Sequence, residues 1–199
     1  MCRSVFIILR KIADNSHMKS EDLIIRMCAP TLAGLKTGSM FSASYRSEAK
    51  VKAELRRLNG LFKPKGLVIM PLRFSEKTVL IYVGRMQALE RDLNEPRAAA
   101  MLKKLNYPCG STEHCLLHLM RRMRTPQGFP HEVGLFLGYP PEDVLGFVRN
   151  RARNYKAVGL WKVYGDTQSA LSRFEACRKC TEESYGRFKS GVSIEQLIM

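Results

Sequence analysis

The sequence predicts a single α/β domain in which helices pack on a mixed sheet, and three observations support this fold class. The chain has 199 residues, a length that suits one hydrophobic core. Two runs rich in β-forming residues, at 67–72 and 78–83, are separated by a short polar segment, which favours an antiparallel hairpin. Two later apolar runs, at 133–137 and 158–164, alternate with helical segments. This order predicts a parallel β-α-β pair with a right-handed crossover.

The first part of the chain is expected to be a poorly ordered or extended arm at residues 1–20, because it shows no sustained hydrophobic period. The α/β domain then covers residues 21–199. A short helix is expected at 21–27, and a loop follows at 28–39 because that stretch contains one proline and two glycines. Apolar residues at near-helical spacing predict an amphipathic helix at 47–62.

Capping residues and prolines mark the helices in the middle of the chain. Residues 85–105 have the pattern of one or two helices interrupted near Pro96, a residue that suits a first helical turn. Ser111 or Thr112 can cap the next helix. We therefore expect a predominantly helical segment between the hairpin and the last third of the chain.

The last third carries the predicted parallel strands. The run at 133–137 is apolar on both faces, which is typical of a central strand covered by helices on both sides. A second strand is expected at 158–164, and Gly191 is expected to end the final helix. The helix starts in this part are Pro141 and, for the last helix, Asp166 or Thr167.

The composition indicates whether the protein spans a membrane, is secreted or carries disulfides. No run of about 18 apolar residues is present, which predicts a protein without a membrane span. The apolar run at 5–9 is shorter than the roughly 7–15 residues of a secretory signal. We therefore expect a cytoplasmic protein, whose six cysteines are reduced thiols or ligands instead of a disulfide framework.

The net charge of +15 at pH 7 makes nucleic-acid binding an alternative function. The sequence contains no contiguous basic tail, zinc finger or aromatic-interleaved RNA-binding pattern. A nucleic acid would therefore be held through non-specific charge. The residues assigned to this alternative are Arg121, Arg122, Arg124, Arg149, Arg151 and Arg153.

Three stretches, at 28–36, 129–147 and 159–164, and the ending at 191–197 carry a likeness to a known family. On these stretches the chain resembles the DUF3793 family of uncharacterised bacterial proteins, from about residue 22 onwards. The resemblance implies no established reaction, cofactor or catalytic set. The iron-uptake and flavodoxin-like genes associated with such proteins imply a link to metal or redox physiology.

Cys28 is the first candidate for chemistry. A thiol in an irregular loop near Lys36 can have a lowered pKa and act as a nucleophile. His131 would serve as its base, with Glu132 orienting the imidazole. The alternative is that Cys28 is a small buried apolar residue and that His131 and Glu132 simply open a strand.

Metal-ligating residue types occur in two places. One group falls within ten residues and the other is a C-x-x-C pair in the last predicted helix. The helical pair lacks the turn that usually presents paired thiolates, so we assign no metal ligand. The residues concerned are Cys109, His114, Cys115, His118, Cys177 and Cys180.

A ligand site is expected at the carboxyl ends of the two late strands, where open α/β sheets place their crevices, with Tyr139 and Tyr164 lining it. The loop before residue 40 has phosphate-binding residue types, Lys36 and Ser39 among them, but lacks the Walker spacing. On an extended strand His131 and Tyr139 would lie about 25 Å apart. The thiol–imidazole pair and the ligand crevice are therefore rival sites.

Three function classes follow from these candidates. We expect first a small-ligand or cofactor-binding protein, whose ligand and cofactor the sequence does not identify. The first alternative is a cysteine-dependent enzyme using Cys28, and the second is a nucleic-acid-associated basic protein.

Overall fold

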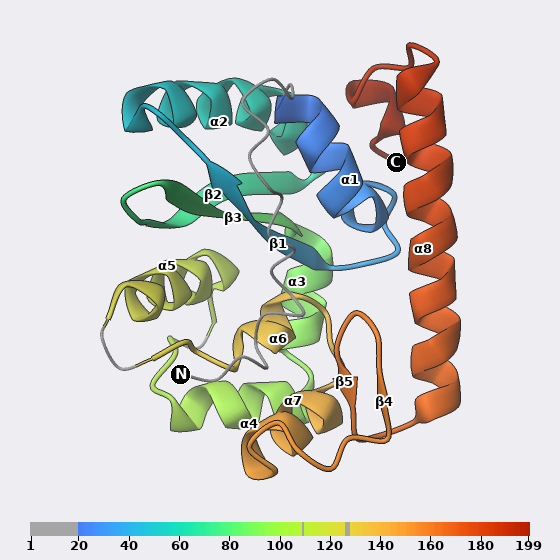
Figure 1. Cartoon of the computed structure of the whole chain (residues 1–199). Helices are drawn as coiled ribbons and strands as arrows, with labels where there is room; N and C mark the ends of the chain where they lie inside the picture. The colour runs from blue at the N-terminus through green and yellow to red at the C-terminus, as the bar shows by residue number, and fades with distance from the viewer. Residues whose placement is uncertain (1–19, 109, 126–127) are drawn as a thin grey trace.

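The computed structural model describes residues 20–108, 110–125 and 128–199. The predicted N-terminal arm lies outside the described residues except for Ser20, where the first helix begins. A three-stranded sheet lies in the middle of the molecule with helices on both faces (Figure 1). The predicted class of helices packed on a sheet is confirmed.

The helices before the β2–β3 hairpin lie on one side of the sheet, and α3, α5 and α6 after it lie on the other. Figure 1 shows α1 and α2 on one side of the sheet and α3, α5 and α6 on the other, while α8 runs beside both layers. The helices are α1 (Ser20–Leu32), α2 (Glu48–Phe62), α3 (Met86–Leu93), α4 (Pro96–Lys104), α5 (Thr112–Arg124), α6 (Val133–Phe136), α7 (Pro141–Arg149) and α8 (Thr167–Lys189), with 3₁₀ turns at Lys63–Lys65 and Glu195–Leu197. The strands are β1 (Gly38–Ser44), β2 (Leu67–Phe74), β3 (Thr78–Arg85), β4 (Ala157–Val158) and β5 (Lys162–Val163).

The central sheet has the order β1-β3-β2, and both pairings are antiparallel. The hairpin predicted for 67–72 and 78–83 is confirmed as β2 and β3. Alternate residues of β3 face opposite sides of the sheet. Leu80 and Tyr82 face the helices that follow the hairpin. Val79, Ile81 and Val83 face α1 and α2. The strand covered on both faces is therefore β3.

The central strand predicted for residues 133–137 is wrong. Val133–Phe136 form the single helical turn α6, and every residue of that turn is buried. A short apolar run does not distinguish a strand from a buried helical turn, since both hide all their side chains. Gly138 follows with a φ of 72°, a conformation that ends the turn and that glycine adopts without strain.

The predicted parallel β-α-β pair is also wrong. Instead of one strand at 158–164, β4 and β5 form a short antiparallel hairpin. Gly159 lies in its reversal, where its N–H donates to the carbonyl of Trp161 (3.1 Å). A Cβ at this position would clash with the ring of Phe174, so glycine allows the hairpin to lie against α8.

The helix starts read from capping residues are confirmed. Pro96 is the first residue of α4 and Pro141 the first of α7. Ser111 accepts the N–H of His114 (3.2 Å) at the start of α5, and Asp166 caps α8. These signals are local, so they act in the same way whatever the tertiary fold.

The loop predicted for residues 28–39 is wrong in its first part, because α1 continues through Pro30 to Leu32. The carbonyls at the end of this helix find a partner on another element. The guanidinium of Arg85, at the end of β3, donates to the carbonyl of Thr31 (2.7 Å) and to that of Leu32. This long-range cap stabilises the last turn of α1.

A buried carboxylate holds the β4–β5 hairpin against α7. Asp143 accepts hydrogen bonds from the indole N–H of Trp161 (2.6 Å) and from the backbone N–H groups of Tyr164 and Gly165 (2.7 Å each). It is only 3% exposed. Three donors compensate the carboxylate for lost water, so Asp143 fixes where the chain passes between α7 and α8.

Tyr82 joins the sheet to the helical layer below it. Its ring packs over Gly38 and Gly84, which lie directly opposite each other in β1 and β3. A Cβ on either glycine would clash with the ring. The hydroxyl of Tyr82 donates to the carbonyl of Phe136 (2.8 Å), so the sheet holds α6 through a buried hydrogen bond.

Tyr82→Phe should lower the free energy of unfolding by about 1–2 kcal/mol, because the buried carbonyl of Phe136 loses its donor. Urea denaturation followed by circular dichroism measures this change. The control is Tyr45→Phe, which removes an exposed hydroxyl that donates to the Ser75 carbonyl (2.8 Å). It should change stability by less than about 0.5 kcal/mol. Equal losses in the two variants would contradict the role given to Tyr82.

Candidate ligand-binding site

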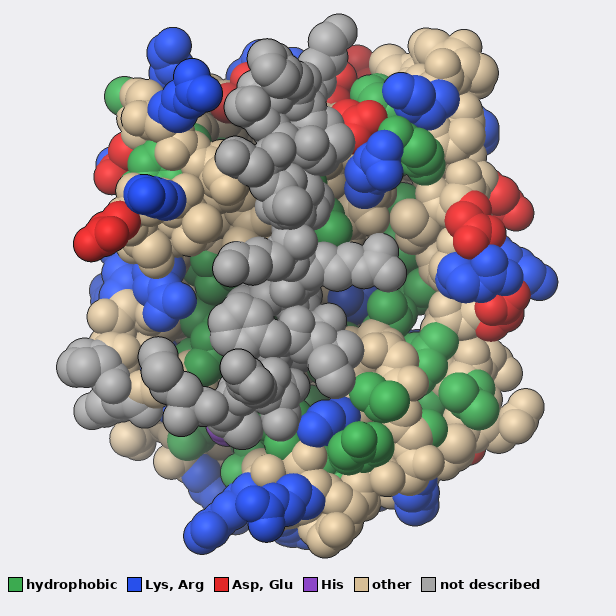
Figure 2. Space-filling view, in the orientation of Figure 1, with side chains coloured by type: hydrophobic (Ala, Val, Ile, Leu, Met, Phe, Trp, Pro, Cys, Tyr) green, Lys and Arg blue, Asp and Glu red, His purple; other side chains and the backbone are tan. Residues whose placement is uncertain are grey.

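A cleft of about 480 Å³ opens where the segment between α1 and β1 meets α3, the α6–α7 connection and α8. Figure 2 shows a gap between α8 and the neighbouring surface in the middle of the view. Charged, polar and aromatic side chains line the cleft, among them Lys36, Thr37, Asp92, Tyr139, Glu142 and Arg173.

Lys36 projects into this cleft from the segment between α1 and β1. Its Nζ atom lies 5.2 Å from the centre of the Tyr139 ring. Burial lowers the pKa of the Lys36 ammonium to about 8, the Cys28 and Cys177 thiols act in the opposite direction, and the charge of Arg173 adds to the lowering. Among the described residues, Lys36 forms no ion pair with a carboxylate.

Arg173 approaches Lys36 from α8. It is partly buried, donates through Nη2 to the carbonyl of Gly138 (3.1 Å), and its guanidinium carbon lies 5.3 Å from the centre of the Trp161 ring. No ion pair joins it to any carboxylate in the described part of the chain. Two cations therefore face one cleft, and no described carboxylate pairs with either of them.

The carboxylates at the cleft are already engaged elsewhere. Asp92 accepts the hydroxyl of Thr37 and forms an ion pair with Arg91 (3.2 Å). Glu142 lies 3.7 Å from Arg97 in an exposed ion pair. Glu95 also lines the cleft and caps α4 by accepting the backbone N–H groups of Arg97 (2.8 Å) and Ala98 (2.9 Å). Because these acids have their own partners, none of them forms an ion pair with Lys36 or Arg173.

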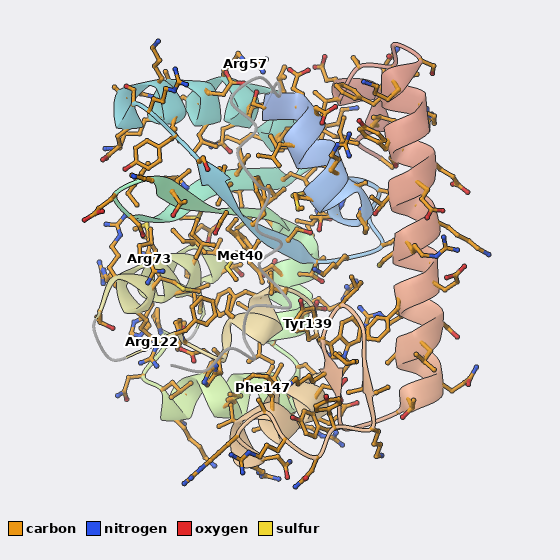
Figure 3. The ribbon with its side chains drawn as sticks, viewed as in Figure 1. Met40, Arg57, Arg73, Arg122, Tyr139 and Phe147 are labelled. Carbon is orange, nitrogen blue, oxygen red and sulfur yellow. The ribbon has the colours of Figure 1, made fainter. Side chains whose placement is uncertain are left out.

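Tyr139 forms the aromatic wall of the cleft (Figure 3). Its hydroxyl donates to the carbonyl of Leu160 (3.1 Å), and its ring stacks on Trp161 at a centroid distance of 4.8 Å. Burial raises the pKa of the Tyr139 hydroxyl. The residue therefore offers a ring face to the cleft while its polar end is already hydrogen-bonded.

Of the four residues predicted to bind a ligand, the structure brings Lys36 and Tyr139 together. Ser39 lies in β1, buried, and shares a hydrogen bond with the Thr31 hydroxyl (2.8 Å). Tyr164 packs against Gly146 of α7, and neither it nor Ser39 lines the cleft.

The residues predicted as a catalytic group lie apart. Cys28 is completely buried in the core formed with α1 and α2, and burial raises the pKa of its thiol to about 12. His131 lies against Phe147, and Glu132 is buried beside Tyr107, on the opposite face of the sheet. This geometry does not form a thiol–imidazole pair.

Glu132 instead belongs to a buried ion pair. Its Oε1 atom accepts from Arg122 Nε (2.6 Å) and from the hydroxyl of Tyr107 (2.9 Å). Arg122 is thereby the one predicted nucleic-acid contact with a carboxylate partner among the described residues. The exposed arginines of that prediction are Arg121, Arg124, Arg149, Arg151 and Arg153.

No group of three or more metal-ligating side chains that could hold an ion occurs in the described ranges. Cys109 lies outside them. Cys177 is buried on α8 and Cys180 is partly buried one turn later. None of the described helices is long and apolar enough to cross a membrane.

Arg173 and Asp92 were not among the residues predicted to bind a ligand. Arg173 lies in a long amphipathic helix where charged residues are expected on the exposed side, and only the packing of α8 beside the cleft distinguishes it. Asp92 follows Arg91 in α3 and shows no motif. No signal in the sequence identifies either residue, because each depends on contacts with distant segments.

A second cavity of about 400 Å³ lies between α1, α2 and β1. Its walls are mostly apolar, and its acid Glu54 is paired with Arg57 (2.9 Å). Arg46 and Lys50 also line this cavity, but both are exposed, whereas the two cations of the cleft at Lys36 are partly buried, so that cleft is the stronger candidate.

Cys28 should react with iodoacetamide at pH 7 at least about 10-fold more slowly than Cys180, because its thiol is buried and its pKa is raised to about 12. Peptide mass spectrometry of the native protein measures both rates. Cys180 is a suitable internal control, since it is only partly buried. Faster labelling of Cys28 would instead support the predicted nucleophile.

Comparisons with known proteins identify a family but no activity. A family model described as "Protein of unknown function (DUF3793)" matches residues 24–198, which confirms the resemblance found in the sequence. No curated protein and no solved structure matches the chain.

Proposed function

The chain belongs to the DUF3793 family, and we propose that it is a small-ligand-binding protein that holds an anion between Lys36 and Arg173. One observation carries the proposal. Two partly buried cations line the same cleft, and no carboxylate of the described residues forms an ion pair with either.

Energetics favour an external anion at this position. Two neighbouring positive charges repel each other, and each loses water by partial burial, so holding the two cations close together is electrostatically costly. A carboxylate or phosphate between Lys36 and Arg173 would remove both penalties. Arg173 adds planar donors that suit such an oxyanion.

The shape of the cleft suits a metabolite. Its volume of about 480 Å³ falls within the roughly 300–1,000 Å³ of small-molecule sites. The ring face of Tyr139 supplies apolar contact beside the two charges. We propose a compact organic anion as the ligand, and a role in metal or redox physiology stays part of this proposal.

A cytoplasmic location belongs to the same proposal. Among the described residues, Cys28, Cys177 and Cys180 carry free thiols. Free thiols are usual in a reducing compartment.

Phosphate and small carboxylates such as citrate should stabilise the protein against heat. A ligand at 100 times its dissociation constant adds about 2.7 kcal/mol, which raises the melting temperature of a chain of this size by roughly 5–10 °C. Lys36→Met and Arg173→Met should each abolish the shift. The matched control is Lys179→Met on α8, where the lysine lies 3.7 Å from Glu175 at an exposed position. Equal shifts in all variants would overturn the proposal.

A second candidate function is non-specific nucleic-acid binding. Figure 2 shows Lys and Arg side chains along the lower edge of the molecule. Within the described ranges, no carboxylate forms an ion pair with Arg121, Arg124, Arg149, Arg151 or Arg153.

If this candidate is correct, the affinity for duplex DNA should fall steeply as salt rises, by about 10-fold or more between 50 and 200 mM. Replacing Arg149, Arg151 and Arg153 together by Gln should reduce that salt dependence, because up to three phosphate contacts are lost. Fluorescence anisotropy measures both. An affinity independent of salt would remove nucleic acid as a partner. The cysteine-dependent enzyme is the third candidate, and the alkylation of Cys28 tests it.

A further inference from the structure

We propose that Lys36 binds its ligand covalently, by forming a reversible imine with an anionic aldehyde or keto acid whose acid group contacts Arg173. This inference rests on the anion site proposed above. The proposal narrows the ligand class from organic anions in general to carbonyl-bearing ones. It uses only side chains that line the cleft.

The surroundings of Lys36 raise the fraction of its amine that is uncharged. The groups that interact electrostatically with it are the thiols of Cys28 and Cys177 and the guanidinium of Arg173, and none of them is a carboxylate. Burial raises the pKa of both thiols, so they remain neutral and do not pair with the ammonium. With burial lowering the pKa of Lys36 to about 8, roughly a tenth of the amine is unprotonated at pH 7.

The cleft also offers a partner for each of the two functional groups of such a ligand, its carboxylate and its carbonyl. Lys36 Nζ lies over the Tyr139 ring at 5.2 Å, on the side of the cleft next to the α1–β1 segment. Arg173 enters from α8 and is fixed by its hydrogen bond to Gly138. A short keto acid or aldehyde acid can thus place its carboxylate on the arginine and its carbonyl carbon near the amine.

Imine formation needs no reagent other than the Lys36 amine and the carbonyl compound. The lone pair of the Lys36 nitrogen attacks the carbonyl carbon and forms a carbinolamine. Loss of water then gives the C=N bond, and the carbonyl oxygen leaves with both hydrogens of the amine. Nothing is oxidised or reduced, and added water reverses the reaction.

Imine formation also removes the repulsion between the Lys36 ammonium and the Arg173 guanidinium. A neutral imine replaces a partly buried ammonium and ends its repulsion with Arg173. An ordinary exposed lysine gains neither benefit, and its amine is almost fully protonated at neutral pH. This difference predicts selective reaction at Lys36.

The test uses the whole chain, glyoxylate as the probe and sodium cyanoborohydride, whose hydride reduces the imine to a stable carboxymethyl-lysine. Peptide mass spectrometry should show modification of Lys36 at least about 10-fold faster than of any other lysine. The rate should rise with pH through about 8, as the Lys36 ammonium loses its proton. Lys162 is an internal control, because it also lies over a tyrosine ring, Tyr155, at 4.6 Å.

Two variants test the covalent step. Lys36→Arg cannot form an imine, so it should lose all labelling at position 36, while the thermal shift of the unaltered chain with phosphate reports separately on the proposed anion site. Arg173→Met should lower labelling of Lys36 at least about 5-fold by weakening capture of the carboxylate. Circular dichroism confirms that each variant is folded.

Labelling of Lys36 no faster than that of Lys162 would overturn the imine. If phosphate still stabilises the protein in a way that needs Lys36 and Arg173, the anion site stands and the ligand is held by charge alone. If neither phosphate nor carboxylates stabilise it and Lys36 is not labelled, both proposals fail.

Discussion

The packing of Tyr82 over two opposed glycines is the constraint on which the candidate site depends. Gly38 and Gly84 leave a space in the sheet that only a large side chain can fill, and the Tyr82 ring occupies it. Its hydroxyl then reaches the carbonyl of Phe136 and holds α6 against the sheet. An aromatic ring placed over glycine removes exposed backbone from water, so this contact stabilises the sheet and the helical layer together. This contact therefore helps to set the position of the segment that leads to Tyr139 relative to β1.

The cleft follows from this constraint through a short series of contacts. Thr37 precedes Gly38, its hydroxyl donates to Asp92, and Gly138 packs closely against it. The chain therefore enters the sheet and leaves α6 at neighbouring points, which brings Lys36 beside Tyr139. The helix α8 completes the site by carrying Arg173 to the carbonyl of Gly138. Each charged group is thus held by backbone or hydrogen-bonded contacts, which suits a site that must keep two cations close together.

The predictions that failed have a common physical origin. Residues 133–137 and 158–164 are apolar enough for strands, but hydrophobicity records burial and not the backbone conformation that achieves it. The first run is buried as the turn α6, and the second divides at Gly159 into β4 and β5. In the same way, Pro30 suggested a loop, whereas Arg85 provides from β3 the donors that allow α1 to continue. These outcomes depend on partners at least 15 residues away in the chain or on space left by them.

The sequence alone determined the α/β class, the β2–β3 hairpin, the helix starts at Pro96 and Pro141, the caps of α5 and α8 to within one residue, and the family. Apart from the family, these features depend on local rules, since periodicity, capping and turn chemistry involve residues within a few positions of one another. The tertiary structure decided that β3 is the covered strand, that Cys28 is enclosed in a core apart from His131, and that Lys36 and Arg173 share a cleft. Such facts depend on how distant segments pack, because the charge or burial of a side chain is set by its neighbours in space and not in the chain.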